Sequence, residues 1–150
     1  MLVVMCVFVM MVPDRSLPTV KARQALPAQV NREDAAFNLG RMGLLLAGLA
    51  DPQFLIPEAA DDRIHQPART TLFPEAPELL RALLDAGALA ASWSGAGPTL
   101  IGIVRAGSAE DVRSGAEAAL AASGVPGRVL ALRPDRRGLV YGDEAEVVLL

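Results

Sequence analysis

The chain has 150 residues, the length of one ordinary domain, and 52% of them are hydrophobic, so it has enough apolar side chains to bury a core. Its net charge of −3 argues against a general nucleic-acid-binding role, because neutralising phosphates takes clustered Lys and Arg. One cysteine and one histidine leave no basis for an intrachain disulfide or a multi-cysteine metal site. We therefore expect an intracellular, cytoplasmic protein with no nucleic-acid partner and no metal site.

The N-terminus is an apolar run, MLVVMCVFVMMV, that ends at Pro13. A helix that spans a bilayer takes about 20 residues, so this run is too short to cross a membrane. No basic residue precedes it and no small-residue cleavage site follows it cleanly, which disfavours the alternative of a targeting segment. The run is rich in valine and predicts a strand buried on both faces. We expect no membrane partner.

Two helices are expected next. The first covers residues 20–26 and ends at Pro27, because proline cannot donate a helical hydrogen bond. The second covers residues 32–50, where large apolar side chains recur near helical spacing and predict a mostly buried helix. Asn31 precedes it as a cap, with Asp34 as its partner three residues later.

The centre of the chain contains more proline. We expect a helix around residues 53–64, then an irregular stretch pinned by Pro67 and Pro74. An amphipathic helix follows and ends at Gly87, a residue typical of helix C-termini. Two strands are then expected, over residues 88–94 and 99–106, on either side of a glycine loop. A helix capped by Ser108 follows over residues 108–124, then a strand over 125–134 and a final strand over 138–150.

This order of elements is a β-α-β-β-α-β pattern, with extra helices in the first crossover. No internal repeat, low-complexity tract or change of composition divides the chain. The sequence therefore predicts a single α+β domain over residues 1–150, with a ferredoxin-like layer.

The glycine loop SGAGPT, residues 94–99, is the first candidate site. Its glycines permit positive φ and remove the Cβ atoms that would keep a phosphate from the backbone. The loop is not of the Walker type, because no lysine follows Gly97 and Pro98 has no N–H. It also leads into a strand rather than a helix, so a hairpin turn is favoured over a ligand-facing loop.

A second candidate is the polar stretch DDRIHQPART, residues 61–70, which contains Arg63, His65 and Arg69. Arginine suits a carboxylate because its planar fork donates two parallel hydrogen bonds. The alternative is a solvated loop with a lone histidine. His65 has no cysteine or second histidine with which to share a metal.

The third candidate pairs Thr19 with Arg23, one helical turn apart. Thr19 stands where a helix cap is expected, and Arg23 alone is a surface charge, so both residues also have purely structural interpretations. No nucleophile, base or paired carboxylate is indicated by pattern alone, and no catalytic residue is assigned.

Four stretches of the sequence follow the order and spacing found in homoserine kinases, which are members of the GHMP small-molecule kinase superfamily. They are VPDRSLPTVKARQALP, DAAFNLGRMGLLLAGL, RIHQPART and SWSGAGPTL. The resemblance covers about residues 3–133. It implies a phosphotransferase that uses ATP and Mg²⁺ to transfer the γ-phosphoryl group to the hydroxyl of L-homoserine, in threonine biosynthesis.

The resemblance also implies site residues. Arg23 and Arg69 would hold the α-carboxylate of L-homoserine, Thr19 would line the same pocket, and His65 is similar to a family position near the substrate. Two cationic groups on one carboxylate would fix the end of the substrate opposite its reactive hydroxyl. The resemblance further implies a loop close to the phosphate, formed by Ser94, Gly95, Ala96 and Gly97.

The chain departs from the superfamily in one respect. The main phosphate loop of the superfamily, P-x-x-x-G-L-G-S-S-A, and the acidic metal ligand expected after it have no counterpart here. The resemblance is therefore to the C-terminal half alone, and we expect the half with the ATP loop to be absent. We expect the chain to be inactive by itself and to self-associate through an exposed apolar surface. The alternatives are a non-catalytic α+β module that binds an amino acid or a partner chain, and a purely structural domain.

Overall fold

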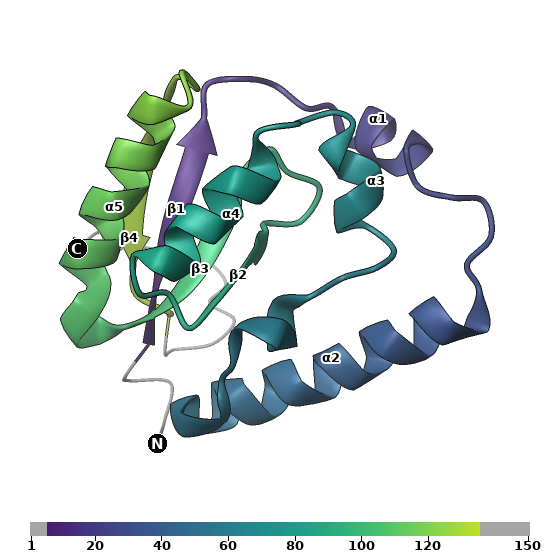
Figure 1. The fold of residues 1–150 in the computed structure, drawn as a ribbon, viewed down its shortest axis with the longest axis horizontal. Helices are drawn as coiled ribbons and strands as arrows, with labels where there is room; N and C mark the ends of the chain where they lie inside the picture. The colour runs from purple at the N-terminus through teal and green to yellow at the C-terminus, as the bar shows by residue number, and fades with distance from the viewer. Residues whose placement is uncertain (1–5, 136–150) are drawn as a thin grey trace, which may run out of the picture.

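The structure, a computed structural model, describes residues 6–135 and confirms the α+β class (Figure 1). The final strand expected over residues 138–150 lies outside the described residues. The elements in chain order are β1 Cys6–Pro13, α1 Thr19–Gln24, α2 Arg32–Ala50, the 3₁₀ turns η2 Pro52–Phe54 and η3 Pro57–Ala60, α3 Gln66–Thr70, α4 Ala76–Asp85, β2 Ala90–Trp93, β3 Leu100–Arg105, the 3₁₀ turn η4 Ala106–Ser108, α5 Ala109–Ala122 and β4 Gly127–Leu132.

The four strands form one sheet in the order β2-β3-β1-β4, and every neighbouring pair is antiparallel. β1 lies in the interior of this sheet between β3 and β4, as the β-α-β-β-α-β pattern predicts. Helices α4 and α5 lie together over one face (Figure 1). The core forms between them and the sheet, with these side chains among those fully or almost fully buried: Val9, Met11, Phe73, Leu79, Leu83, Leu100, Val104 and Val112.

The prediction that the first strand is buried on both faces is wrong. Along β1, Val9 and Met11 are fully buried, whereas Phe8 and Met10 between them are half-buried. Burial alternates because α4 and α5 cover only the face on which Val9 and Met11 lie. The other face is covered in part, by the 3₁₀ turns after α2.

The prediction of a mostly buried helix over residues 32–50 is also wrong. Helix α2 has the expected bounds, and Asn31 caps it by accepting a hydrogen bond from the Asp34 N–H at 2.7 Å, but Gly48 is its one buried residue. A Cβ at Gly48 would lie 2.6 Å from Leu55 Cδ1, so glycine there allows the η2 turn to approach. Among the described residues, the main contacts of α2 are with the two 3₁₀ turns, and several of its large apolar side chains are exposed.

Between α2 and α4 the helices differ from the expected ones because of the prolines there. The helix expected over residues 53–64 is two separate turns, η2 and η3, each beginning at a proline. Pro67 lies in the first turn of α3, which begins at Gln66, instead of belonging to an irregular stretch, because proline fits the first turn of a helix. Ser108 precedes α5, as expected, but its side chain makes no capping hydrogen bond.

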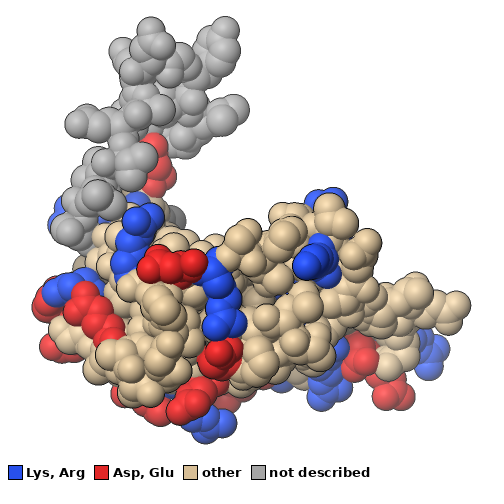
Figure 2. Space-filling view, turned by 90° about the horizontal axis from the view of Figure 1, so that it is seen from above, with Lys and Arg blue, Asp and Glu red and all other residues tan. Residues whose placement is uncertain are grey.

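The described surface carries charges of both signs. On the face drawn in Figure 2, basic and acidic side chains are interspersed rather than separated by sign. On α5, for example, Arg113 bonds to both Glu110 and Glu117. No helix within residues 6–135 is both long and apolar enough to cross a bilayer.

Leu39, Met42 and Leu46 form an exposed apolar patch on α2, 74%, 54% and 61% accessible respectively. We expect this α2 patch to drive self-association, and the double variant Leu39→Glu/Leu46→Glu to lower the average mass measured by light scattering and the binding of an apolar dye. The control variant Ala118→Glu/Ala122→Glu adds the same charge to exposed positions of α5, and it should change neither the average mass nor the dye binding. A wild-type chain that is monomeric and binds no dye would contradict this prediction.

Candidate functional site

The glycine loop is a tight hairpin turn between β2 and β3, as predicted. The Ser94 N–H donates to the Thr99 carbonyl at 2.8 Å, and the Gly97 N–H donates to the Ser94 carbonyl at 3.2 Å. Gly95 and Gly97 have φ of +61° and +83°, values that L side chains rarely adopt. A Cβ at Gly97 would also overlap the ring of Trp93. Glycine is therefore required at Gly97 for two independent reasons.

The loop offers little to a nucleotide. The N–H groups of Ser94 and Gly97 are used within the turn, and Pro98 has none. The N–H groups of Gly95 and Ala96 have no acceptor among the described residues, and two such groups fit one anionic oxygen rather than a triphosphate. Within residues 6–135, no three His, Cys, Asp or Glu side chains gather as a metal site would need. The described residues alone do not make a site for ATP and Mg²⁺, and no chemical step is derived through either.

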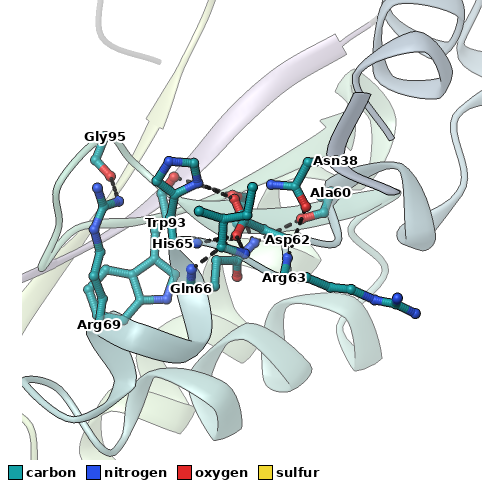
Figure 3. A network of polar contacts seen from close by, with 11 residues as sticks. Asn38, Ala60, Asp62, Arg63, His65, Gln66, Arg69, Trp93 and Gly95 are labelled. Atoms are coloured by element: carbon teal, nitrogen blue, oxygen red, sulfur yellow. Dashed lines mark hydrogen bonds and ion pairs between the residues drawn. The ribbon is translucent and has the colours of Figure 1, made fainter. Parts of the chain in front are cut away.

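Arg69 joins helix α3 to the glycine loop (Figure 3). Its Nη1 donates to the Gly95 carbonyl at 2.7 Å, although the two residues lie far apart in the sequence. Its Nε is buried and has no acceptor among the described residues. Leaving such a donor unpaired is costly, so the arrangement favours a bound ligand oxygen as its acceptor.

The segment before α1 is fastened to the same region. Arg15 forms an ion pair with Glu75 at 3.1 Å, and its guanidinium stacks 4.5 Å above the centre of the Phe73 ring. A Cβ at Gly97 would lie 3.6 Å from Leu17 Cδ2, so this segment also touches the glycine loop. These contacts hold the segment just before α1 against the residues that follow α3 and against the glycine loop.

Thr19 and Arg23 lie on α1. Thr19 is the first residue of the helix and makes no capping bond, because Pro18 occupies the cap position; the prediction of Thr19 as a cap is wrong. Thr19 and Arg23 are both exposed. Among the described residues the Arg23 side chain has no hydrogen bond or ion pair, to Arg69 or to any other residue; the Arg23 carbonyl accepts from the Leu26 N–H. The structure thus places both arginines on neighbouring helices without joining their side chains.

Arg63 faces away from the glycine loop. Its N–H donates to Asn38 Oδ1 at 3.0 Å, and its guanidinium stacks 3.8 Å above the centre of the Phe37 ring. A long ion pair of 3.8 Å joins it to Asp34. Since all three partners belong to α2, Arg63 holds that helix and does not join the candidate site.

Asp62 organises the start of α3, and reasoning from the sequence missed it. One carboxylate oxygen, Oδ1, accepts from the backbone N–H groups of Ile64 at 2.7 Å, Gln66 at 3.3 Å and His65. The other, Oδ2, lies 2.7 Å from His65 Nδ1. The signal in the sequence is an Asp placed a few residues before a short helix that has a proline in its first turn.

Burial acts to raise the pKa of Asp62, but the hydrogen bonds from His65, Ile64 and Gln66 together outweigh it and lower the pKa. Since the lowered pKa means that folding favours the carboxylate, this stabilisation is present above the unfolded pKa and is lost as the pH falls through the folded one. We expect the gap in urea midpoint between wild type and Asp62→Asn to narrow as the pH falls from 6 to about 3. The urea midpoint of Asp61→Asn, at the exposed neighbouring position, should change with pH in parallel with that of wild type. A difference in urea midpoint between wild type and Asp62→Asn that does not change with pH would contradict the lowered pKa of Asp62.

A cavity of about 720 Å³ lies between α2 and the partly covered sheet face. Its walls are mainly apolar, with Leu39 and Met42 from α2 and Ile101 and Ile103 from β3. Charged ligands need convergent polar partners, and among the polar lining residues of this cavity Asp62, His65 and Gln66 lie at or just before the start of α3. The candidate site for a charged ligand is therefore the region formed by α3, the glycine loop and α1.

The fold and this region together define a class of protein. The chain belongs to the GHMP kinase C-terminal family, whose model, described as "GHMP kinases C terminal", matches residues 35–122. Two similar proteins are homoserine kinases, from Desulfitobacterium hafniense with 39% identity over 128 residues and from Thermus thermophilus with 48% identity over 101 residues. They confirm the resemblance to homoserine kinases.

The solved structures agree with this assignment. The crystal structure of homoserine kinase from Cytophaga hutchinsonii superposes with a TM-score of 0.76 and 30% identity, over 84% of this chain and 41% of that one. The two relatives named above align with 85% and 67% of this chain but with only 43% and 35% of their own lengths. The chain thus spans less than half the length of each of these relatives.

Proposed function

We propose that this chain is the substrate-binding half of a homoserine kinase-like enzyme, which transfers the γ-phosphoryl group of ATP to the hydroxyl of L-homoserine in threonine biosynthesis. Residues 1–150 then form one domain of the GHMP kinase C-terminal type. The observation that carries the proposal is Arg69, which contacts the glycine loop and keeps a buried Nε without an acceptor. The similarity to homoserine kinases supports this choice of ligand.

Arg69 binds the α-carboxylate of the substrate in this proposal. Its Nη1 is already used by the Gly95 carbonyl, whereas Nε, on another edge of the guanidinium, lacks an acceptor. The edge formed by Nε and Nη2 has two parallel donors, which match the two oxygens of a carboxylate once the buried Nε is uncovered. Arg23 and Thr19 on α1 complete the pocket in this proposal, because Leu17, just before α1, lies against the glycine loop.

The reactive end of the substrate then lies near the glycine loop. The N–H groups of Gly95 and Ala96, which have no acceptor among the described residues, can donate to one anionic oxygen of a phosphoryl group in transfer. Phosphoryl transfer depends mainly on alignment and on stabilising charge, so this half contributes by holding the acceptor in place. The complete enzyme supplies the rest of the site for ATP and Mg²⁺.

We expect the purified chain alone to form no O-phosphohomoserine from ATP, Mg²⁺ and L-homoserine, because its described residues do not hold a triphosphate. Phosphorus NMR of the reaction mixture checks this directly. The full-length homoserine kinase from Thermus thermophilus, assayed in parallel, is the positive control. A phosphomonoester signal that grows with the concentration of this chain would contradict the expectation.

The direct test of substrate binding is a thermal-shift titration. L-homoserine is expected to raise the melting temperature, because a ligand that binds only the folded state stabilises it. L-threonine, whose hydroxyl lies one carbon closer to the carboxylate, is expected to give a smaller rise. Equal melting temperatures with and without L-homoserine would contradict a substrate pocket formed by this chain.

A further inference from the structure

The segment between β1 and α1, residues 14–18, is attached to distant parts of the chain. The Asp14 N–H donates to the carbonyl of the residue just before β4 at 2.8 Å. Arg15 bonds to Glu75 through both ends of its fork: Nη1 donates to Oε2 at 3.3 Å, and Nη2 donates to Oε1 at 3.1 Å. Leu17 lies against the glycine loop. The path of the chain into α1 is therefore fixed by contacts that the segment makes elsewhere in the fold.

The contact of Arg15 with Glu75 is more than an ordinary surface ion pair. The two side chains are 37% and 34% accessible, and the guanidinium also stacks 4.5 Å above the centre of the Phe73 ring, which is fully buried. Exposed pairs with one contact contribute little to stability, whereas a two-point pair with a stacked guanidinium has one defined geometry. We call this arrangement of Arg15 on Glu75 and Phe73 the Arg15–Glu75 clamp.

The clamp is connected to both parts of the candidate site. The Phe73 N–H donates to the Arg69 carbonyl at 3.2 Å, and the Phe73 ring packs edge-on against Trp93 with ring centres 5.9 Å apart. The Trp93 ring occupies the space that a Cβ at Gly97 would need, and Leu17 approaches the same glycine. The contacts thus close a ring that runs through Arg15, Phe73, Trp93, Gly97 and Leu17.

Helix α1 has little other attachment. It begins at Thr19, directly after residues 14–18, and buries one residue, Ala22. The Arg23 side chain has no hydrogen bond or ion pair among the described residues. A short helix is stabilised mainly by the face that it buries, so one buried alanine holds α1 weakly. The position of α1 therefore depends largely on the segment that leads into it.

We propose that the Arg15–Glu75 clamp sets the position of α1 relative to Arg69 and the glycine loop, and so presents Arg23 to the substrate carboxylate. The inference rests on the function proposed above and adds two residues to it. Arg15 and Glu75 contact no substrate and are positioning residues that act through α1. Losing the clamp leaves Arg69 in place and weakens substrate binding by releasing α1.

The first test needs no ligand and measures amide hydrogen exchange in α1. The N–H groups of Ala22, Ala25 and Leu26 are bonded to carbonyls earlier in the chain. In Arg15→Ala these groups should exchange about three- to tenfold faster than in wild type, because local opening of α1 becomes easier. Exchange in α5 of the same sample reports global unfolding and should stay unchanged. Arg113→Ala, which removes an arginine bonded to two glutamates of α5, should leave exchange in α1 unchanged.

The second test measures the apparent Kd of L-homoserine in thermal-shift titrations. Arg15→Ala and Glu75→Gln should each raise it about three- to tenfold. The double variant should bind no more weakly than either single variant, because both changes remove the same clamp. Arg15→Lys keeps the charge without the planar fork, so its apparent Kd should lie between those of wild type and Arg15→Ala. Arg113→Ala should bind as wild type does.

The outcomes separate this inference from the function on which it rests. If exchange in α1 is the same in wild type and Arg15→Ala, or rises only as much as exchange in α5, the clamp does not position α1. If the single variants bind L-homoserine as tightly as wild type, or their effects multiply in the double variant, the inference is overturned while the substrate site stands. If L-homoserine does not stabilise wild type, the proposed function is overturned, and the substrate role of the clamp with it. Faster exchange confined to α1, with equal losses of affinity in the single and double variants, supports the inference.

Discussion

Replacing Arg69 by alanine is expected to abolish the rise in melting temperature that L-homoserine gives to the wild-type chain. The variant removes both donors proposed for the α-carboxylate and the bond to the Gly95 carbonyl. At a ligand concentration 100 times Kd, the lost stabilisation is about 2.7 kcal/mol. For a chain of this size, that corresponds to roughly 5–10 °C in a thermal-shift titration.

Two further variants separate the shape of the guanidinium from its charge and from unspecific effects. Arg69→Lys keeps the charge but replaces a planar fork by a single point of contact, so we expect a reduced rise in melting temperature. Arg113→Ala removes an arginine of α5 whose partners are Glu110 and Glu117, and it should leave the rise unchanged. An undiminished response of Arg69→Ala would place the carboxylate elsewhere.

The sheet could be predicted from the sequence because its signals are local. The strands β2 and β3 were expected within one or two residues of their observed bounds, since glycine and proline interrupt two apolar runs between them. Gly87 ends α4 with a φ of +107°, as a glycine in that position predicts. The order of elements then left few ways to arrange an antiparallel sheet.

Burial could not be predicted in the same way. The apolar side chains of α2 recur at helical spacing, and that pattern predicts a helix with an apolar face. It does not say which element covers that face. Leu45 packs against the 3₁₀ turns, whereas Leu46, the next residue, is 61% accessible. The same limit explains β1, where a continuous apolar run is buried on one face only.

The candidate site was predictable residue by residue but not as an arrangement. Resemblance to homoserine kinases indicated Arg69 and the glycine loop separately, and only the structure shows that Arg69 bonds to Gly95. Asp62 was within reach of local reasoning, because its partners Ile64, His65 and Gln66 follow it directly. The spatial relation of Arg23 to Arg69 depends on the path of the chain between α1 and α3, for which the sequence has no local signal.

Replacing Gly97 by alanine is expected to destabilise the fold by about 2–5 kcal/mol. Alanine at a φ of +83° costs about 1–2 kcal/mol by itself. The added Cβ would overlap the ring of Trp93, which is 6% accessible and packs edge-on against Phe73 with ring centres 5.9 Å apart. Moving that ring disturbs the core and costs about 1–3 kcal/mol more. The urea midpoint at constant slope measures the sum.

Gly95→Ala is the matched control for this prediction. Gly95 also has a positive φ, +61°, but a Cβ there meets nothing within 4 Å, so alanine pays only the conformational cost of about 1–2 kcal/mol. The difference between the two variants isolates the contact of the glycine loop with Trp93. Equal losses would mean that the Trp93 ring moves aside without cost. A larger loss at Gly97 would show that the glycine loop is held in place by the core beneath it.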